Sequence, residues 1–203
     1  MTLQDLSDAQ DQYCKYIRIA EKAIKKAESR VCYENPDGTE VSGLCIPAIN
    51  ELRCAAYHIS LAFSNVTDEE KLSGYRNAIG HCKRAAYEAL DSLLQFYIKE
   101  LHAFQKDYET VLIGDTLPAY LEDCVFIDSV IDEQSNREDI TLDDISTQEA
   151  QLAKLEGIWK KWKAARQELN KQLTRSWYPY ISWGISILSI IAAIIMGILA
   201  YFK

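Results

Sequence analysis

The residues best suited to chemistry in this sequence are an arginine and a histidine five positions apart. Arg76 and His81 form an Arg-x4-His motif, and the polar Asn77 follows the arginine. Histidine can exchange a proton near neutral pH, and a fixed guanidinium can stabilise an anionic transition state; metal-independent RNA cleavage needs both. Side chains five apart on a helix point about 140° apart, so the pair converges imperfectly within one chain.

The same spacing occurs a second time, and a simpler interpretation of both copies stays open. Arg53 and His58 also fit the motif, but without a polar residue after the arginine. Short motifs arise readily by chance, so the alternative is that His81 is a structural histidine in a contact between helices. No His, Cys, Asp or Glu group has metal-ligand spacing, and no nucleophile motif is present, so we expect neither a metal nor another cofactor.

An uncharged stretch of 22 residues, 181–202, lies near the end of the sequence. As a helix it spans roughly 33 Å, enough for a hydrocarbon core of about 30 Å. Aromatic residues of the kind that lie at membrane interfaces gather at its start: Trp177, Tyr178, Tyr180 and Trp183. We therefore predict a transmembrane anchor over residues 177–203.

The sequence around this segment predicts its orientation and its contacts. Lys and Arg residues precede it in excess, so we expect the rest of the chain on the cytoplasmic side of a membrane, which we take to be a bacterial inner membrane. Small residues recur along one helical face: Ser182, Ser186, Ser189, Ala193 and Gly197. Such a stripe lets helices approach closely in lipid and favours a homo-oligomer around a small pore, with a lone anchor as the alternative.

Residues 1–176 are predicted to form one cytosolic bundle of about five long helices. Eight Gly and four Pro in 203 residues leave few turns, and apolar residues recur at steps of three and four. No strand pattern is evident, which excludes a parallel α/β enzyme. A capping box over residues 67–70 begins the longest soluble helix, which we expect to end at Gly114. The predicted fold class is all-α: a long-helix bundle with one C-terminal transmembrane helix.

The long helix and the helix before it resemble the core of the HEPN superfamily. The resemblance covers about residues 46–113, with the segments ELRCAAYHISLAF and SGYRNAIGHCKRAAYEALDSLLQFYIKEL. It implies that Arg76 stabilises phosphate charge, His81 serves in acid–base work and Asn77 orients the site, with two domains sharing one cleft. A HEPN-like body joined to a membrane helix is similar to the pore-forming accessory protein of type VI-B CRISPR systems, which strengthens antiphage defence.

Three functions from different classes fit these features. The first is a membrane-anchored, oligomerising effector that permeabilises the bilayer in antiviral defence, with a defence-system protein as its partner. The second is a metal-independent ribonuclease tethered to the membrane, although the net charge of −8 weighs against an RNA substrate. The third is a non-catalytic membrane scaffold, in which Trp159 and Trp162 lie on the membrane surface or, equally well, pack inside the bundle.

Overall fold

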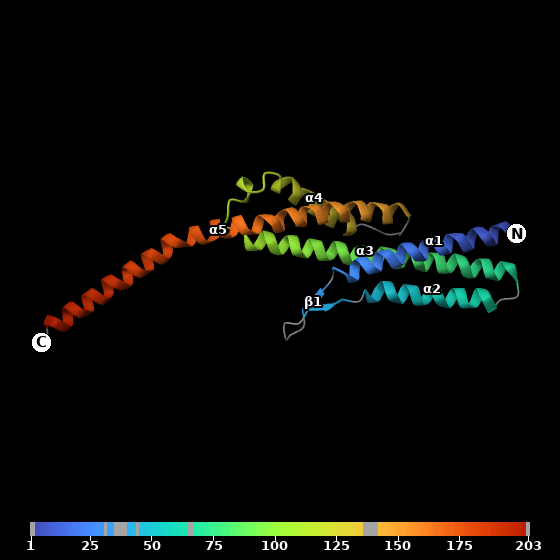
Figure 1. Ribbon diagram of the computed structural model, residues 1–203, viewed down its shortest axis with the longest axis horizontal. Coiled ribbons are helices and arrows are strands. Elements are labelled where there is room, and N and C mark those ends of the chain that lie inside the picture. The colour runs from blue at the N-terminus through green and yellow to red at the C-terminus, as the bar shows by residue number, and fades with distance from the viewer. Residues whose placement is uncertain are drawn as a thin grey trace.

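The computed structural model describes residues 3–30, 32–34, 40–43, 45–64, 67–135 and 142–201. It is an elongated bundle from which one helix projects (Figure 1). The elements in chain order are α1 (Leu3–Glu28), β1 (Cys32–Glu34), β2 (Glu40–Ser42), α2 (Ile46–Ser64), α3 (Asp68–Asp107), the 3-10 turn η1 (Ile113–Asp115), α4 (Tyr120–Ser135) and α5 (Leu142–Tyr201). The predicted all-helical fold is confirmed for the body of the chain.

One short hairpin departs from the expectation that the chain contains no strands. β1 and β2 pair antiparallel, with Cys32 opposite Ser42 and Glu34 opposite Glu40. Each strand has three residues, which is too short for an alternating pattern to stand out in the sequence. The turn predicted at residues 35–38 lies outside the described residues.

Helix α3 is the spine of the bundle. α1 and α2 lie along its first half, and α5 lies along its second half with α4 on the outside (Figure 1). The predicted capping box at its start is confirmed, because the Thr67 hydroxyl accepts from the Glu70 amide and the Glu70 carboxylate accepts from the Thr67 amide. Such a cap is worth about 1 kcal/mol.

The predicted end of this helix at Gly114 is wrong. α3 stops at Asp107, and Gly114 belongs to the separate turn η1. Tyr108 is buried, and its hydroxyl donates to Asn170 Oδ1 of α5 at 2.6 Å. Ile113 and Leu117 are buried as well, so the chain leaves the helical path after Tyr108 and folds back onto the bundle.

Small residues bring α2 and α3 close together. The buried alanines of α2 recur every seven residues, at Ala48, Ala55 and Ala62. A Cβ atom added at Gly74 of α3 would lie 2.8 Å from the Ala62 Cβ and 3.0 Å from the His58 carbonyl oxygen. Since real Cβ contacts are not that short, any other residue at position 74 would force the two helices apart.

The main core lies along α3, against which buried residues of α1, α4 and α5 pack. Trp162, Tyr97, Leu93 and Leu155 are among its largest fully buried side chains. The Trp162 indole donates to Asp123 Oδ2 at 3.0 Å, which satisfies its N–H inside the protein. Trp162 therefore packs inside the bundle and does not lie on a membrane surface, which was the other interpretation of this residue.

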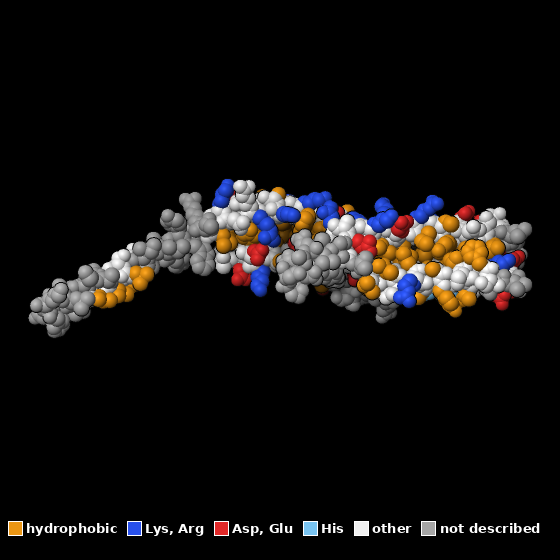
Figure 2. Space-filling model, turned by 60° about the horizontal axis from the view of Figure 1, so that its bottom comes forward, with side chains coloured by type: hydrophobic (Ala, Val, Ile, Leu, Met, Phe, Trp, Pro, Cys, Tyr) orange, Lys and Arg blue, Asp and Glu red, His pale blue; other side chains and the backbone are white. Residues whose placement is uncertain are grey.

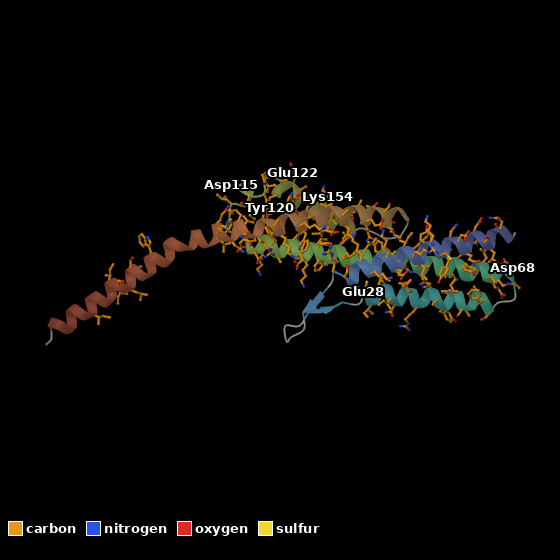
Figure 3. The ribbon with its side chains drawn as sticks, in the orientation of Figure 1. Glu28, Asp68, Asp115, Tyr120, Glu122 and Lys154 are labelled. Carbon is orange, nitrogen blue, oxygen red and sulfur yellow. The ribbon has the colours of Figure 1, made fainter. Side chains whose placement is uncertain are left out.

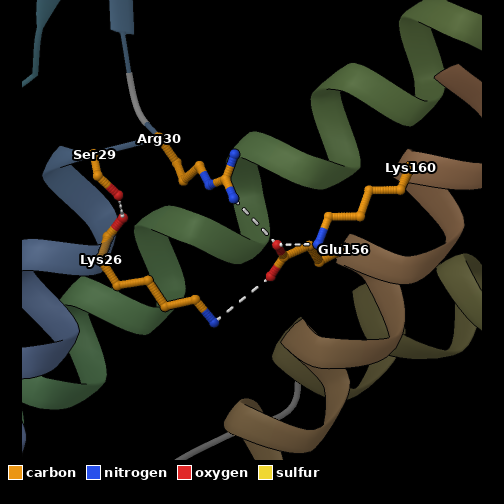
Figure 4. A network of polar contacts seen from close by, with 5 residues as sticks. All are labelled: Lys26, Ser29, Arg30, Glu156 and Lys160. Atoms are coloured by element: carbon orange, nitrogen blue, oxygen red, sulfur yellow. Dashed lines mark hydrogen bonds and ion pairs between the residues drawn. The ribbon is translucent and has the colours of Figure 1, made fainter.

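A polar network joins the end of α1 to α5 (Figure 4). The Glu156 carboxylate lies 2.8 Å from Lys160 Nζ, 3.3 Å from Arg30 Nη2 and 3.8 Å from Lys26 Nζ. The Lys160 hydrogen bond lowers the pKa of Glu156 below its ordinary value, against the opposing effect of burial, and the charges of all three cations lower it further. One carboxylate thus balances part of the positive charge at the end of α1, where cations also favour the helix dipole.

Helix α5 runs as a single helix of 60 residues from the bundle into the projecting arm (Figure 1). The expected boundary between residues 176 and 177 therefore falls inside one continuous helix. In the part of the chain that the structure describes, no helix has an apolar run sufficient to cross a membrane. Within 177–203, side chains are described only for Trp183, residues 186–191 and Ile195.

Candidate functional site

The histidine of the first motif lies in a contact between α2 and α3. His81 is half-buried, and its Nδ1 lies 2.8 Å from Glu51 Oε2. Arg84 Nε donates to the same carboxylate oxygen at 2.9 Å, and Arg84 Nη2 lies 2.8 Å from His81 Nδ1. Because Nδ1 can serve only one of these two partners, we assign its proton to the bond with Glu51, where the charges are complementary.

The acid of this cluster is held in its charged form. Burial alone would raise the pKa of Glu51, but hydrogen bonds from His81 and Arg84, together with their charges, lower that pKa below its ordinary value. A carboxylate that accepts from Nδ1 orients the imidazole ring and leaves Nε2 available for a substrate. The arrangement is compatible with acid–base work as well as with a purely structural contact.

The two copies of the motif meet in space. The His58 ring stacks on the His81 ring, with centroids 5.1 Å apart and an interplanar angle of 18°. Tyr57 meets His58 edge-on at 5.6 Å. The two rings border an open hollow of about 530 Å³, whose lining also includes Asn50, Arg53, Cys54 and Tyr57. This histidine pair is absent from the sequence prediction, which treated the two motifs as unrelated.

Arg76 and Asn77 do not join this hollow. Both side chains are exposed on α3, and within the described part of the chain Arg76 makes no hydrogen bond or ion pair. The guanidinium at His81 belongs to Arg84 instead. The catalytic roles of Arg76, Asn77 and His81 stay predictions, and the arrangement offers Arg53 as the cation that shares a hollow with both histidines.

The hollow contains the groups needed to hold an anion and to move protons. Arg53 donates from Nη1 to Asn50 Oδ1 at 3.0 Å, which orients its guanidinium at the rim. Two imidazoles, a guanidinium and a phenol hydroxyl together can bind a phosphate group. Among the described residues, no group of three or more His, Cys, Asp and Glu side chains could hold a metal ion. The five cysteines whose side chains are described are all free.

The predicted membrane residues lie on the projecting part of α5. Trp183 is 73% exposed there, and the large apolar side chains that follow it are 48–68% exposed: Ile187, Leu188, Ile190, Ile191 and Ile195. Figure 2 shows hydrophobic side chains along this arm, outside the bundle. Ser186 and Ser189 of the small-residue stripe are exposed. Side chains of the remaining predicted membrane residues lie outside the described set: Trp177, Tyr178, Tyr180, Ser182, Ala193 and Gly197.

The described apolar side chains of the arm share one side of the helix. At 100° per residue they fall within an arc of about 160°, and Ser186 and Ser189 lie outside that arc. In the structure this apolar side is exposed and is not packed on the bundle. The transmembrane anchor over this segment stays a prediction.

Comparisons of the chain with models of protein families, with curated proteins and with solved structures found no match in any of the three.

Proposed function

We propose that this protein is a membrane-anchored helical effector that self-associates through α5 and permeabilises the bilayer. The observation that carries the proposal is the continuous α5 helix, which leaves the bundle with large apolar side chains exposed along it. Each Leu, Ile or Phe at the centre of a membrane helix favours insertion by about 0.3–0.6 kcal/mol. A bilayer around residues 181–202 would remove these side chains from water.

Continuity of α5 supports a mechanical link between the bundle and the membrane. A helix without a break between Leu169, which is buried in the core, and Trp183, which is exposed on the arm, transmits rotation of the bundle to the proposed span. Association of bundles would then set which face of each span meets its neighbours. The stripe that includes Ser186 and Ser189 is the face on which close helix contact costs least.

Dye release from lipid vesicles containing the full-length protein tests this proposal. We expect leakage from the wild type and its loss in the double variant Ser186→Leu/Ser189→Leu, because leucine side chains would hold the helices apart. The matched control, Ile187→Leu/Ile190→Leu, conserves volume on the same helix and should leak as the wild type does. Absence of leakage from the wild type at every protein-to-lipid ratio would contradict permeabilisation, and flotation without leakage would favour the scaffold alternative.

A second candidate, the membrane-tethered ribonuclease, is favoured by the stacked His58–His81 pair beside Arg53. Two imidazoles at one hollow can divide the work of base and acid in cleavage by the 2′-hydroxyl. In buffer with a metal chelator, RNA cleavage should vanish in His58→Ala and in His81→Ala but persist in His102→Ala. Loss of cleavage in Arg53→Ala but not in Arg76→Ala would show that Arg53 is the cation that acts with the histidines. Loss in Arg76→Ala but not in Arg53→Ala would instead support the Arg76–His81 motif.

The place of either activity in antiviral defence rests on the resemblance to HEPN-like membrane proteins and stays a prediction. It implies a homo-oligomer and a partner protein that signals infection. Co-purification of a defence protein with the full-length chain from its native cells, and its loss in a variant defective in phage resistance, would support that role.

A further inference from the structure

The seam between α3 and α5 is covered on one side by α4. Asp123 of α4 accepts from the Trp162 indole at 3.0 Å and pairs with Lys161 at 2.6 Å. The centre of the Tyr120 ring of α4 lies 4.9 Å from that of the Trp162 ring. Lys163 follows Lys161 by two positions and so points about 200° away from it around α5. Lys163 therefore stands on the side of the seam that faces away from α4.

A hollow of about 390 Å³ opens on that side, and we call it the seam hollow. The described residues that line it all belong to α3 and α5, and they include Phe104, Trp159, Trp162, Lys163 and Arg166. Lys163 Nζ lies 4.6 Å from the centre of the Trp159 ring, and Arg166 Cζ lies 5.4 Å from the centre of the Phe104 ring. Apolar rings with cations beside them suit a partner that presents apolar side chains next to acids.

Positive charge continues from the seam hollow to the end of α1. Five cations lie along this side of the bundle: Lys26, Arg30, Lys160, Lys163 and Arg166. Three carboxylates lie among them: Glu100, Asp107 and Glu156. Three of the cations share the single carboxylate of Glu156 (Figure 4), so this side keeps a positive excess. A surface that docks here should therefore be acidic.

The outward side of α4 has the complementary character. Four exposed residues follow one another at steps of four, three and four, which places them on one side of the helix, and we call them the outer α4 face: Leu121, Val125, Asp128 and Asp132. Leu121 is 76% exposed and Val125 is 69% exposed, and the sequence has no Lys or Arg from 107 to 136. Figure 3 shows Glu122 of α4 and Glu28, at the end of α1, on opposite sides of the bundle. One chain thus carries an acidic apolar face on one side and a basic aromatic hollow on the other.

Contacts between α4 and α5 show which residues of the two helices share a height along the bundle. The helices run antiparallel, because Asp123 pairs with Lys161 and Gln151 donates to Glu133 at 2.6 Å. Asp128 lies midway between these two contacts on α4, and residue 156 lies midway between them on α5. Asp128 is therefore level with the middle of that α5 segment.

The outer α4 face and the basic side are matched in height. Asp128 is level with Glu156, around which the cations of Figure 4 gather. Leu121 and Val125 lie nearer the arm, level with the seam hollow that Trp162 lines. Copies whose arms enter one membrane in the same direction are related by rotation about the membrane normal, without a shift along it. Surfaces of equal height on opposite sides of the chain then meet between neighbours.

We propose that the outer α4 face of one copy docks on the seam hollow of the next, so that a second copy of this chain is the partner of both surfaces. Leu121 and Val125 cover the apolar rings of the neighbour. Asp128 lies beside Lys160 and Arg30 of that neighbour. The inference rests on the proposed function, because that function places the arms of several copies in one membrane. Since the two surfaces differ, the contact is heterologous and passes from copy to copy around a closed ring.

Photo-cross-linking of the full-length protein in phosphatidylcholine vesicles tests the contact, with the photo-reactive amino acid p-benzoylphenylalanine at Val125. We expect covalent dimers and larger species whose linked peptides map to residues 100–104 and 159–166 of the neighbour. The matched control is the same probe at Phe63, which is 77% exposed on α2 near the opposite end of the bundle and should give few links between copies. A third probe, at Ile187, reports whether the arms themselves associate.

The outcomes separate this inference from the proposal on which it rests. Links between copies at Ile187 but not at Val125 overturn the docking and leave association of the arms intact, whereas links at neither site overturn both. Links at Val125 without dye release support the docking and contradict permeabilisation. Links from Val125 that map to lipid or to α4 of the neighbour overturn the proposed pairing, as do equal yields at Val125 and Phe63.

A charge swap sharpens the result. Asp128→Lys should lower the yield at Val125 by about threefold or more, because attraction to the cations of the neighbour becomes repulsion. The control Asp11→Lys makes the same change of charge at an exposed position of α1 near the other end of the bundle, and should cross-link as the wild type does. Adding Lys160→Glu to Asp128→Lys should restore the yield. An unchanged circular dichroism melt shows that these exposed substitutions leave the bundle folded, and a yield that does not fall in Asp128→Lys, or does not recover in the double variant, would overturn the pairing.

Discussion

The two parts of α5 are both helical, but the first buries its apolar side chains and the second exposes them. From Ile145 to Leu169 the buried residues form one stripe against α3, and charged residues occupy the other side. Beyond Trp183 the described apolar side chains are exposed, and the sequence carries no charge from 181 to 202. The first part obtains its apolar environment from neighbouring helices, and in our proposal the second obtains one from a bilayer.

This contrast shows what a helix can and cannot supply by itself. A helix satisfies its backbone hydrogen bonds within itself, so α5 can remain helical both inside the bundle and beyond it. The side chains differ, and it is their burial that assigns the first part to the bundle and the second to the proposed membrane. Variants that change one part and spare the other therefore test the comparison directly.

Charges in the proposed span should have the largest effect. Ile187→Arg/Ile191→Arg places two guanidiniums in the apolar segment, at about 2.5–3.5 kcal/mol each near the centre of a membrane helix. We expect the variant to lose flotation with vesicles. Its matched control, Ala164→Arg/Gln167→Arg, adds the same charges at exposed positions of the packed part and should float as the wild type does. Equal flotation of both variants would contradict a span in this segment.

Truncating the core tryptophan should affect the packed part alone. Trp162→Ala removes a fully buried ring and one of the two donors of Asp123, whose carboxylate still pairs with Lys161 at 2.6 Å, so we expect a loss of about 3–5 kcal/mol in unfolding free energy, mainly from lost packing. For a chain of this length the melting temperature falls by roughly 6–20 °C. Trp183→Ala, on the arm, should leave the melt of the bundle unchanged in detergent. A similar decrease from both variants would show that the arm packs against the bundle.

Replacing glycine by alanine should change the free energy of unfolding in opposite directions at two helix positions. Gly74→Ala brings a Cβ against Ala62 and the His58 carbonyl, so we expect destabilisation of about 1–3 kcal/mol as α2 moves away. Gly157→Ala on α5 meets nothing within 4 Å and should stabilise by about 0.5–1 kcal/mol, because alanine loses less backbone entropy. Chemical denaturation measures both, and stabilisation by Gly74→Ala would refute the close approach of α2 and α3.

The smallest effect should come from the polar attachment of α5 to α1. The pKa of Glu156 is lowered in the folded protein, so its contribution to stability is present above the unfolded pKa and is lost as the pH falls through the folded pKa. Because its cationic partners are 42–61% exposed, we expect less than about 1 kcal/mol. Urea unfolding of wild type and Glu156→Gln should differ at pH 7 and converge in the acid range. A difference that grows on acidification would reverse the assigned sign.

Local signals in the sequence predicted the elements well where the chain itself supplies the determinants. The start of α3 follows from the side chains of Thr67 and Glu70, which act within one helical turn. Its end at Asp107 was not predictable in the same way, because it depends on Tyr108 finding Asn170 more than sixty residues away. The short hairpin escaped detection since three residues are too few to show a period.

The candidate site illustrates the same division. Each histidine was visible in its motif, but the stacked pair was not, although antiparallel helices joined after Ser64 would bring residues near 58 and 81 to the same level. That signal required pairing the two helices rather than reading each alone. Arg84, which contacts His81 in place of Arg76, lies one helical turn from it and could have been proposed from the i,i+3 spacing.

The sequence by itself determined that this chain is helical and that residues 181–202 carry no charge, because periodicity and composition act along the chain. Only the tertiary structure decided that His58 meets His81, that Tyr108 meets Asn170, and that α5 continues unbroken past the bundle. Those relations arise from small residues such as Gly74 and Ala62, which let helices dock closely, and from contacts between segments far apart in the chain. Such docking depends on the packing of complementary surfaces, which no single stretch of sequence contains.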